Sequence, residues 1–167
     1  MIKTPIFLIG FMASGKSSLA KKLANRLELS CLDLDDMIAE KEGRGITEIF
    51  KKEGEQYFRE AERRALKEVA SKRAVIALGG GTPCFYDNMD LIKKSGTSVY
   101  LNVPLKVLLG RLKQNRSKRP LIANLSEAEL LDFVKHQLEE RSPYYLQADL
   151  VVEKPKISPN ELIALLT

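Results

Sequence analysis

The apolar run IFLI at residues 6–9 leads directly into the segment GFMASGKS at residues 10–17. This second segment matches the pattern GxxxxGK[ST], and Leu19, Leu23 and Leu27 then recur every four residues, as on one face of a helix. A strand, a glycine-containing loop and an amphipathic helix in this order are typical of a phosphate-binding loop, because backbone N–H groups and the helix N-terminus can surround phosphate oxygens. The segment predicts binding of a nucleoside triphosphate.

Two side chains of the loop have a predicted role of their own. Lys16 supplies a positive charge for the β- and γ-phosphates, and the hydroxyl of Ser17 can ligate Mg²⁺. The chain contains neither a DxxG nor an NKxD segment, which a switch GTPase would need, and small kinases remain the favoured class. The predicted nucleotide-binding residues of the loop are Gly10, Ala13, Ser14, Gly15, Lys16, Ser17 and Ser18.

Short apolar runs alternate with longer amphipathic segments along the rest of the chain. This alternation predicts an α/β fold, a three-layer αβα sandwich with helices on both faces of a five-stranded parallel sheet. The predicted strands are 6–9, 31–34, 75–78, 98–102 and 150–152. The predicted helices are one that begins near Lys16 and others at 36–42, 46–52, 55–71, 88–94, 105–114, 127–141 and 159–165.

Length and composition predict one ordinary globular domain, residues 1–167. Of these residues, 44% are hydrophobic, and the formal net charge is +5. The longest uncharged stretch, residues 74–86, is shorter than the roughly 20 residues of a membrane span, and we expect a cytoplasmic protein without membrane contact. Trp is absent and no aromatic residues are interleaved with basic ones, which disfavours nucleic acid. Cys31 and Cys84 lie far apart and are expected to be small buried hydrophobes.

A cluster of carboxylates follows the second predicted strand. Asp33 and Asp35 stand two residues apart, so extended backbone would point both side chains the same way at the carboxyl edge of the sheet. One carboxylate could hold the hydration shell of Mg²⁺ while the other accepts a hydrogen bond from an attacking hydroxyl. Asp36 is expected to cap the next helix instead.

Further motifs give the chain a family resemblance that spans nearly its whole length. The relevant segments are LDLD at 32–35, GRGI at 43–46, FREAE at 58–62, GGG at 79–81, RPL at 119–121 and RSPYY at 141–145. In this order and spacing the chain resembles the shikimate kinase family, small P-loop kinases of aromatic amino acid biosynthesis. The resemblance implies transfer of a phosphoryl group from ATP, with Mg²⁺, to the 3-hydroxyl of shikimate. It also implies an acceptor-binding region at about 33–62 and a mobile lid at about 112–125.

The resemblance assigns roles to the acceptor-site residues. Asp33 would hold Mg²⁺ through water, and Asp35 would bind a shikimate hydroxyl and take its proton. Arg59 and Arg141 would pair with the shikimate carboxylate, which a guanidinium can meet with two parallel hydrogen bonds. Glu62 lies three residues after Arg59 and could orient it, although a solvent-exposed pair is the alternative. The backbone of Gly79, Gly80 and Gly81 would approach both the γ-phosphate and the acceptor ring.

The segment from Arg111 to Arg119 contains five basic residues and no acidic one. In the family, the arginine of RPL reaches the transferring phosphoryl group, which implies a catalytic role for Arg119, and the residue at the position of Arg111 lies against adenine. Lys113 and Lys118 are expected to be solvated, and no role follows for Arg116. Lys154–Lys156 occupy the region where the family wraps adenine, without a specific residue assignment.

Two departures from the family pattern lie in the phosphate loop. Many members have glycine near its middle and threonine after the GK pair, where this chain has Ala13-Ser14 and Ser17-Ser18. Ser17 keeps the hydroxyl for the metal, whereas a different loop path at Ala13 would affect nucleotide binding first. Two other hypotheses remain: a related kinase for gluconate or a nucleoside monophosphate, and a non-catalytic nucleotide-binding or RNA-associated protein. The favoured hypothesis is a monomer that binds ATP and shikimate, without nucleic acid as a partner.

Overall fold

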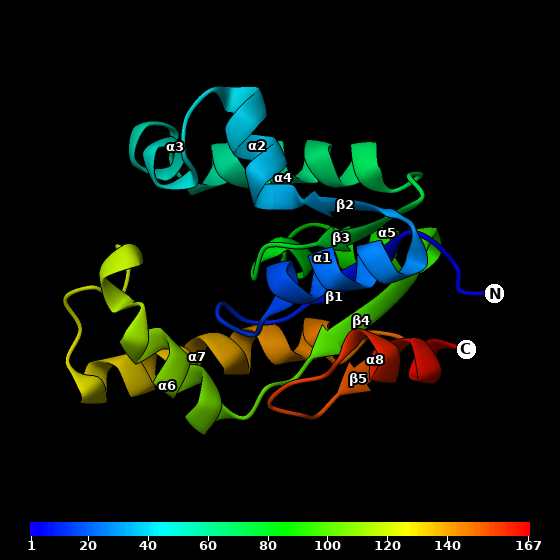
Figure 1. The fold of residues 1–167 in the computed structure, drawn as a ribbon. Coiled ribbons are helices and arrows are strands. Elements are labelled where there is room, and N and C mark those ends of the chain that lie inside the picture. The colour runs from blue at the N-terminus through cyan, green and yellow to red at the C-terminus, as the bar shows by residue number, and fades with distance from the viewer.

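The computed structural model describes residues 1–167 and contains one five-stranded parallel sheet with helices on both faces (Figure 1). The strand order is β2-β3-β1-β4-β5. The strands are β1 (Ile6–Ile9), β2 (Ser30–Asp33), β3 (Ala74–Ala77), β4 (Thr97–Leu101) and β5 (Leu150–Val152). The predicted α/β sandwich is therefore confirmed. β1 and β5 have the predicted limits, and the other three strands each begin and end one residue earlier than predicted.

All predicted helices are present, and two short 3-10 turns, η1 and η2, were not foreseen. The helical elements are α1 (Lys16–Leu27), α2 (Leu34–Glu42), α3 (Ile46–Glu53), α4 (Glu55–Val69), η1 (Thr82–Cys84), α5 (Asn88–Ser95), α6 (Leu105–Gln114), η2 (Arg116–Lys118), α7 (Glu127–Tyr145) and α8 (Pro159–Leu166). The largest extension beyond a predicted limit is in α7, which continues past Arg141 and through Pro143. Proline disfavours a helix interior, so its sequence position suggested an earlier end.

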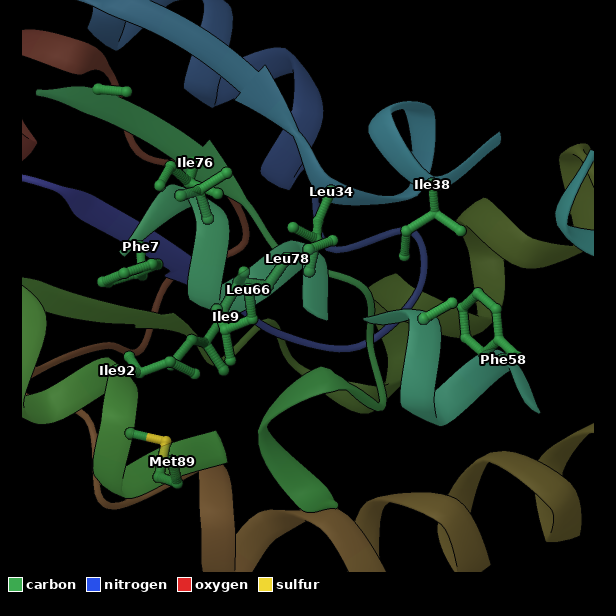
Figure 2. Packing of buried hydrophobic residues seen from close by; sticks show 14 of the residues in the cluster. Phe7, Ile9, Leu34, Ile38, Phe58, Leu66, Ile76, Leu78, Met89 and Ile92 are labelled. Carbon is green, nitrogen blue, oxygen red and sulfur yellow. The ribbon is translucent and has the colours of Figure 1, made fainter. Parts of the chain in front are cut away.

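The central strand β1 supplies side chains to both layers of the core because successive residues of a strand point to opposite faces. Ile6 and Leu8 pack in a cluster with residues of α1 and α8. Phe7 and Ile9 pack in the other main cluster, with residues of α4 and α5 (Figure 2). The four β1 residues are fully buried, so the phosphate loop that follows them begins at a strand in the middle of the core.

The first turn of α2 differs from the prediction. Asp33, not Asp36, is the N-cap, and its Oδ1 accepts hydrogen bonds from the backbone N–H groups of Asp35 and Asp36 at 3.1 and 3.2 Å. Asp35 therefore lies in a helix, and the expected strand-like alignment of Asp33 with Asp35 is wrong. The two carboxylates still lie at the same edge of the sheet, because the helix begins directly at the end of β2.

The sheet order separates two regions on either side of the phosphate loop. α2, α3 and α4 lie beside β2 and β3, whereas α6 and α7 lie toward β4 and β5 (Figure 1). A third apolar cluster joins α6, α7 and the segment between them, and it contains Leu108, Ile122 and Leu130. The loop after β1 thus stands between an α2–α4 region and an α6–α7 region.

Two further expectations from the sequence can be compared with the structure. None of the helices combines the length and the apolar character needed to span a bilayer. Both cysteines are free, but Cys31 is exposed and Cys84 is half-buried. The expectation that Cys31 is buried is therefore wrong, because β2 is an edge strand and Ser30 and Cys31 are exposed on it.

Candidate active site

The backbone of the loop between β1 and α1 depends on residues with special conformations. Gly10 is needed because a Cβ there would lie 2.8 Å from Ser14 Oγ and 3.1 Å from the carbonyl oxygen of Leu101. Gly15 has φ 93° and precedes the first residue of α1, a backbone conformation that glycine adopts without strain. Ala13 also has a positive φ, 64°, so alanine follows the loop at some conformational cost. Ala13 therefore has a backbone conformation that glycine would adopt without strain.

Lys16 lies inside this loop. Its Nζ donates hydrogen bonds to the carbonyl oxygens of Gly10 and Phe11, at 2.7 and 2.9 Å. Burial lowers the pKa of the Lys16 ammonium from its usual 10.5 to about 8, and the negative charges of Asp35 and Asp33 oppose that shift. A nearby anion would raise the pKa of this amine again and so favour its charged form.

Ser17 and Asp33 meet at the start of α1. The hydroxyl of Ser17 donates to Asp33 Oδ2 at 2.7 Å, while the other oxygen of Asp33 caps α2. A hydroxyl and a carboxylate oxygen beside a phosphate loop are the hard oxygen donors that Mg²⁺ prefers, directly or through water. These two residues therefore fit a magnesium ion that also binds nucleotide phosphates.

A cavity of about 610 Å³ adjoins the phosphate loop on the side of β4 and β5. Arg111 and Arg119 line it together with Lys154–Pro159 and loop residues such as Ala13 and Gly15. Arg111 bridges its two walls, because Nη1 donates to the carbonyl oxygen of Ala13 at 3.0 Å and Nη2 to that of Pro155 at 2.6 Å. The structure thus brings the predicted adenine-side residues together. A second cavity of about 570 Å³, along α2 and α4, contains none of the predicted site residues.

The glycine triplet after β3 lies against three of the predicted acceptor-site side chains. A Cβ on Gly79 would lie 3.0 Å from Asp35 Oδ1, and one on Gly80 would lie 3.0 Å from Arg141 Nη1. A Cβ on Gly81 would lie only 2.6 Å from Arg59 Nη1. Any side chain on the triplet would displace these groups, so the glycines allow Asp35, Arg59 and Arg141 to converge.

Asp35 is the most strongly perturbed carboxylate of the acceptor site. Its pKa is raised from 3.8 to about 6, mainly by burial and then by the nearby carboxylates of Glu62 and Asp33. The positive charges of Lys16 and Arg59 oppose this rise. Its Oδ1 is buried and has no hydrogen-bond partner. Such an atom is costly unless a donor reaches it, and a carboxylate of this pKa can accept a proton near neutral pH.

The two arginines of the acceptor site differ in their surroundings. Arg59 is buried and its Nη1 donates to Glu62 Oε1 at 2.9 Å, so the alternative of a solvent-exposed pair is wrong. Arg141 forms no salt bridge and lies 5.7 Å from the centre of the Phe11 ring. The site therefore combines one oriented guanidinium with one that has no acidic partner, a suitable pair for a carboxylate.

Three residues near the triplet were not singled out from the sequence. Tyr145 is fully buried, and its hydroxyl donates to the carbonyl oxygen of Gly80. Thr82 donates to Glu62 Oε2 at 2.8 Å, and the ring of Phe85 covers Arg59. The signals in the sequence were limited to position: Thr82 directly follows the glycines, Phe85 lies four residues after them, and Tyr145 ends the RSPYY segment.

The fold and the loop after β1 together define a P-loop phosphotransferase. Residues 12–166 match the family description shikimate kinase. The chain belongs to the shikimate kinase family. A shikimate kinase of Phocaeicola vulgatus is 44% identical over 146 residues, which cover 87% of this chain and 83% of the relative.

Solved structures give the same result. The crystal structure of shikimate kinase from Bacteroides thetaiotaomicron superposes with a TM-score of 0.93 at 39% identity and covers 98% of both chains. The structure of shikimate kinase from Acinetobacter baumannii in complex with shikimate has a TM-score of 0.83 at 33% identity, with 96% of this chain and 88% of that chain covered.

Proposed function

We propose that this protein transfers the γ-phosphoryl group of ATP to the 3-hydroxyl of shikimate, giving shikimate 3-phosphate and ADP. Family membership makes it a kinase that acts on an alcohol and favours shikimate over gluconate or a nucleoside monophosphate. It also disfavours a non-catalytic role. The observation that carries the proposed chemistry is Asp35 Oδ1, a buried acceptor without a hydrogen-bond partner beside the glycine triplet.

Asp35 acts as the base for the acceptor hydroxyl. The hydroxyl donates to the carboxylate and passes its proton to it as the oxygen forms a bond to the γ-phosphorus. The bond from that phosphorus to the β,γ-bridging oxygen breaks, and ADP leaves with the bonding electron pair. A raised pKa of about 6 suits Asp35 to this task, because the carboxylate is ionised at neutral pH yet basic enough to take the proton.

Charge neutralisation supplies the larger part of the rate enhancement in phosphoryl transfer. Lys16 leaves its backbone carbonyl partners for the β- and γ-phosphates, and Arg119 approaches the transferring group from the nucleotide cavity that it lines. Mg²⁺, held by Ser17 and through water by Asp33, would neutralise phosphate charge when bound. The hydroxyl-to-carboxylate contact of 2.7 Å between those two residues supports this assignment.

Arg59 and Arg141 bind the carboxylate of shikimate. They reach the glycine triplet from different helices, α4 and α7, and therefore approach the ligand from two directions. Paired guanidinium groups favour a planar carboxylate, and their charge orients the ring so that a hydroxyl faces Asp35.

We also propose a monomer that works in the cytoplasm, where ATP is supplied, with residues 112–125 as a lid. Both halves of the site come from one chain, so no second copy is needed. Light scattering of the purified protein should give a mass near 18.8 kDa.

ADP release should be measured with MgATP and shikimate, gluconate, AMP, CMP or no acceptor in parallel. Turnover with shikimate alone is the expected result, and turnover with another acceptor alone would overturn the substrate assignment. Arg59→Ala should abolish detectable shikimate binding while ADP still binds, and equal loss of both ligands would contradict the role of Arg59. Arg64→Ala, an exposed arginine on the same helix, is the matched control and should behave as wild type.

A further inference from the structure

The guanidinium of Arg59 is enclosed by aromatic rings. The ring of Phe85 is the nearest, with its centre 3.9 Å from Arg59 Cζ, and the rings of Phe58 and Phe50 lie 5.2 and 5.9 Å away. A cation interacts with the face of a ring within about 6 Å of its centre, so 3.9 Å places the guanidinium in direct contact with Phe85. Phe85 therefore covers Arg59 and restricts the tilt of its plane.

Two nitrogens of the same guanidinium also donate hydrogen bonds to carboxylates. Nη1 donates to Glu62 Oε1 at 2.9 Å and Nε to Glu55 Oε1 at 3.4 Å. The backbone of Gly81 is so close that a Cβ there would lie 2.7 Å from Nη2. No hydrogen bond within the chain uses Nη2, so this nitrogen keeps its donors for a ligand.

The partner of Arg59 is itself held by the turn that ends at Phe85. Thr82 Oγ1 donates to the second oxygen of Glu62 at 2.8 Å, and both side chains are buried. The carbonyl oxygen of Thr82 accepts from Asn88 Nδ2 at 2.8 Å, and Asn88 Oδ1 accepts from Arg63 Nη1 at 2.7 Å. One short turn thus fixes Arg59 twice, through Glu62 and through the ring of Phe85.

We propose that Phe85 is a positioning residue for the acceptor carboxylate. By stacking on Arg59, it holds the guanidinium plane in the orientation that directs Nη2 toward the ligand, and Thr82 supports the same orientation through Glu62. A free arginine side chain loses rotational entropy when it binds, and a guanidinium already held in plane loses less. The inference rests on the proposed role of Arg59 in binding the carboxylate.

Phe85 is suited to a test because it is only half-buried, so its replacement removes little of the core. Phe85→Leu keeps an apolar side chain but removes the ring. We expect its KM for shikimate to rise about 5- to 10-fold, with KM for ATP and kcat within about 2-fold of wild type. Phe85→Tyr restores the ring face and should restore KM. Tyr86→Leu removes the adjacent exposed ring and is the matched control.

A second pair of variants tests the other contact of the turn. Thr82→Val removes the hydroxyl that donates to Glu62, and Thr82→Ser keeps it. The first should raise KM for shikimate, and the second should leave it near the wild-type value. Thermal unfolding of each variant is measured as well. A raised KM at an unchanged unfolding temperature supports the positioning role, and a raised KM with a large loss of stability contradicts it.

The outcomes separate this inference from the proposed function. If Arg59→Ala raises KM for shikimate and Phe85→Leu does not, the positioning role is wrong and the role of Arg59 stands. If Arg59→Ala itself leaves KM unchanged, the proposed function of Arg59 fails. A Phe85→Leu variant with equal rises in both KM values, not restored by Phe85→Tyr, would indicate a general structural role and would also overturn the inference.

Discussion

The phosphate-binding loop presents mainly backbone from one continuous segment, whereas the proposed acceptor site combines side chains from separate elements. Gly10–Gly15 connect β1 to α1, and Lys16 and Ser17 begin the helix. Asp35, Arg59 and Arg141 instead come from α2, α4 and α7 and meet at the glycine triplet after β3. A loop built from backbone can tolerate Ala13 in place of glycine, because the contacts do not depend on that side chain. The acceptor site depends on the identity and burial of each residue.

The largest effect is expected for Arg119, which lines the cavity beside the phosphate loop. Arg119→Ala should lower kcat about 10³-fold, because an arginine that stabilises the transferring phosphoryl group contributes at least that much. KM for ATP and for shikimate should change far less. Lys118→Ala, an exposed neighbour, is the control. Steady-state kinetics with an unchanged kcat would remove Arg119 from the mechanism.

Asp35→Asn should lower kcat about 10²-fold or more by removing the base. In the wild type, kcat/KM should fall as the pH drops below about 6, because the carboxylate of Asp35 becomes protonated. The variant should lack this acidic limb. A wild-type pH profile that stays flat down to pH 5 would contradict the assignment.

The same substitution should stabilise the ligand-free protein. The folded-state pKa of Asp35 is raised from 3.8 to about 6, chiefly by burial, so ionisation lowers the stability progressively between these pH values and by its full amount above pH 6. Asp35→Asn should therefore raise the free energy of unfolding by about 3 kcal/mol at pH 8, and most of the gain should disappear toward pH 4. Urea unfolding at both pH values provides the comparison. If Asp35→Asn instead lowered the free energy of unfolding at pH 8, burial would not destabilise the ionised carboxylate of Asp35.

The lowered pKa of Lys16 predicts that the protein takes up protons when a nucleotide binds. Its pKa of about 8 in the ligand-free protein means that about half of the molecules have a neutral amine at pH 8. An added phosphate favours the charged form, so ADP binding at pH 8 should take up about half a proton. Calorimetry in buffers of different ionisation enthalpy measures this number. Lys16→Arg, which stays charged, should show none of it.

The smallest expected effect comes from Ala13. Ala13→Gly removes the cost of a positive φ of 64° but makes the unfolded chain more flexible, so the net stabilisation should be about 0.5–1 kcal/mol. Ala164→Gly, at an exposed position of α8, should instead destabilise by a similar amount. Thermal unfolding of the two variants checks the opposite signs. Equal destabilisation would mean that Ala13 is unstrained.

The local pattern of apolar and polar residues was sufficient to predict most of the strands and helices. Residues 6–9 are a strand and residues 105–114 a helix with the predicted limits, because period and flanking residues agree there. Two errors have different physical causes. α7 passes through Pro143 and so brings the hydroxyl of Tyr145 to the carbonyl oxygen of Gly80. Asp33 caps α2 in place of Asp36, because the helix begins directly where β2 ends.

The sequence by itself determined the phosphate loop, since its contacts come from neighbouring residues and its spacing is a local property. It also determined the family through the order of several motifs. Only the tertiary structure decided which groups surround Asp35 and Arg59. Burial raises the pKa of Asp35, and the turn that contains Thr82 and ends at Phe85 holds Arg59 in place. Burial and long-range contacts depend on how distant segments pack, and no spacing along the chain encodes that packing directly.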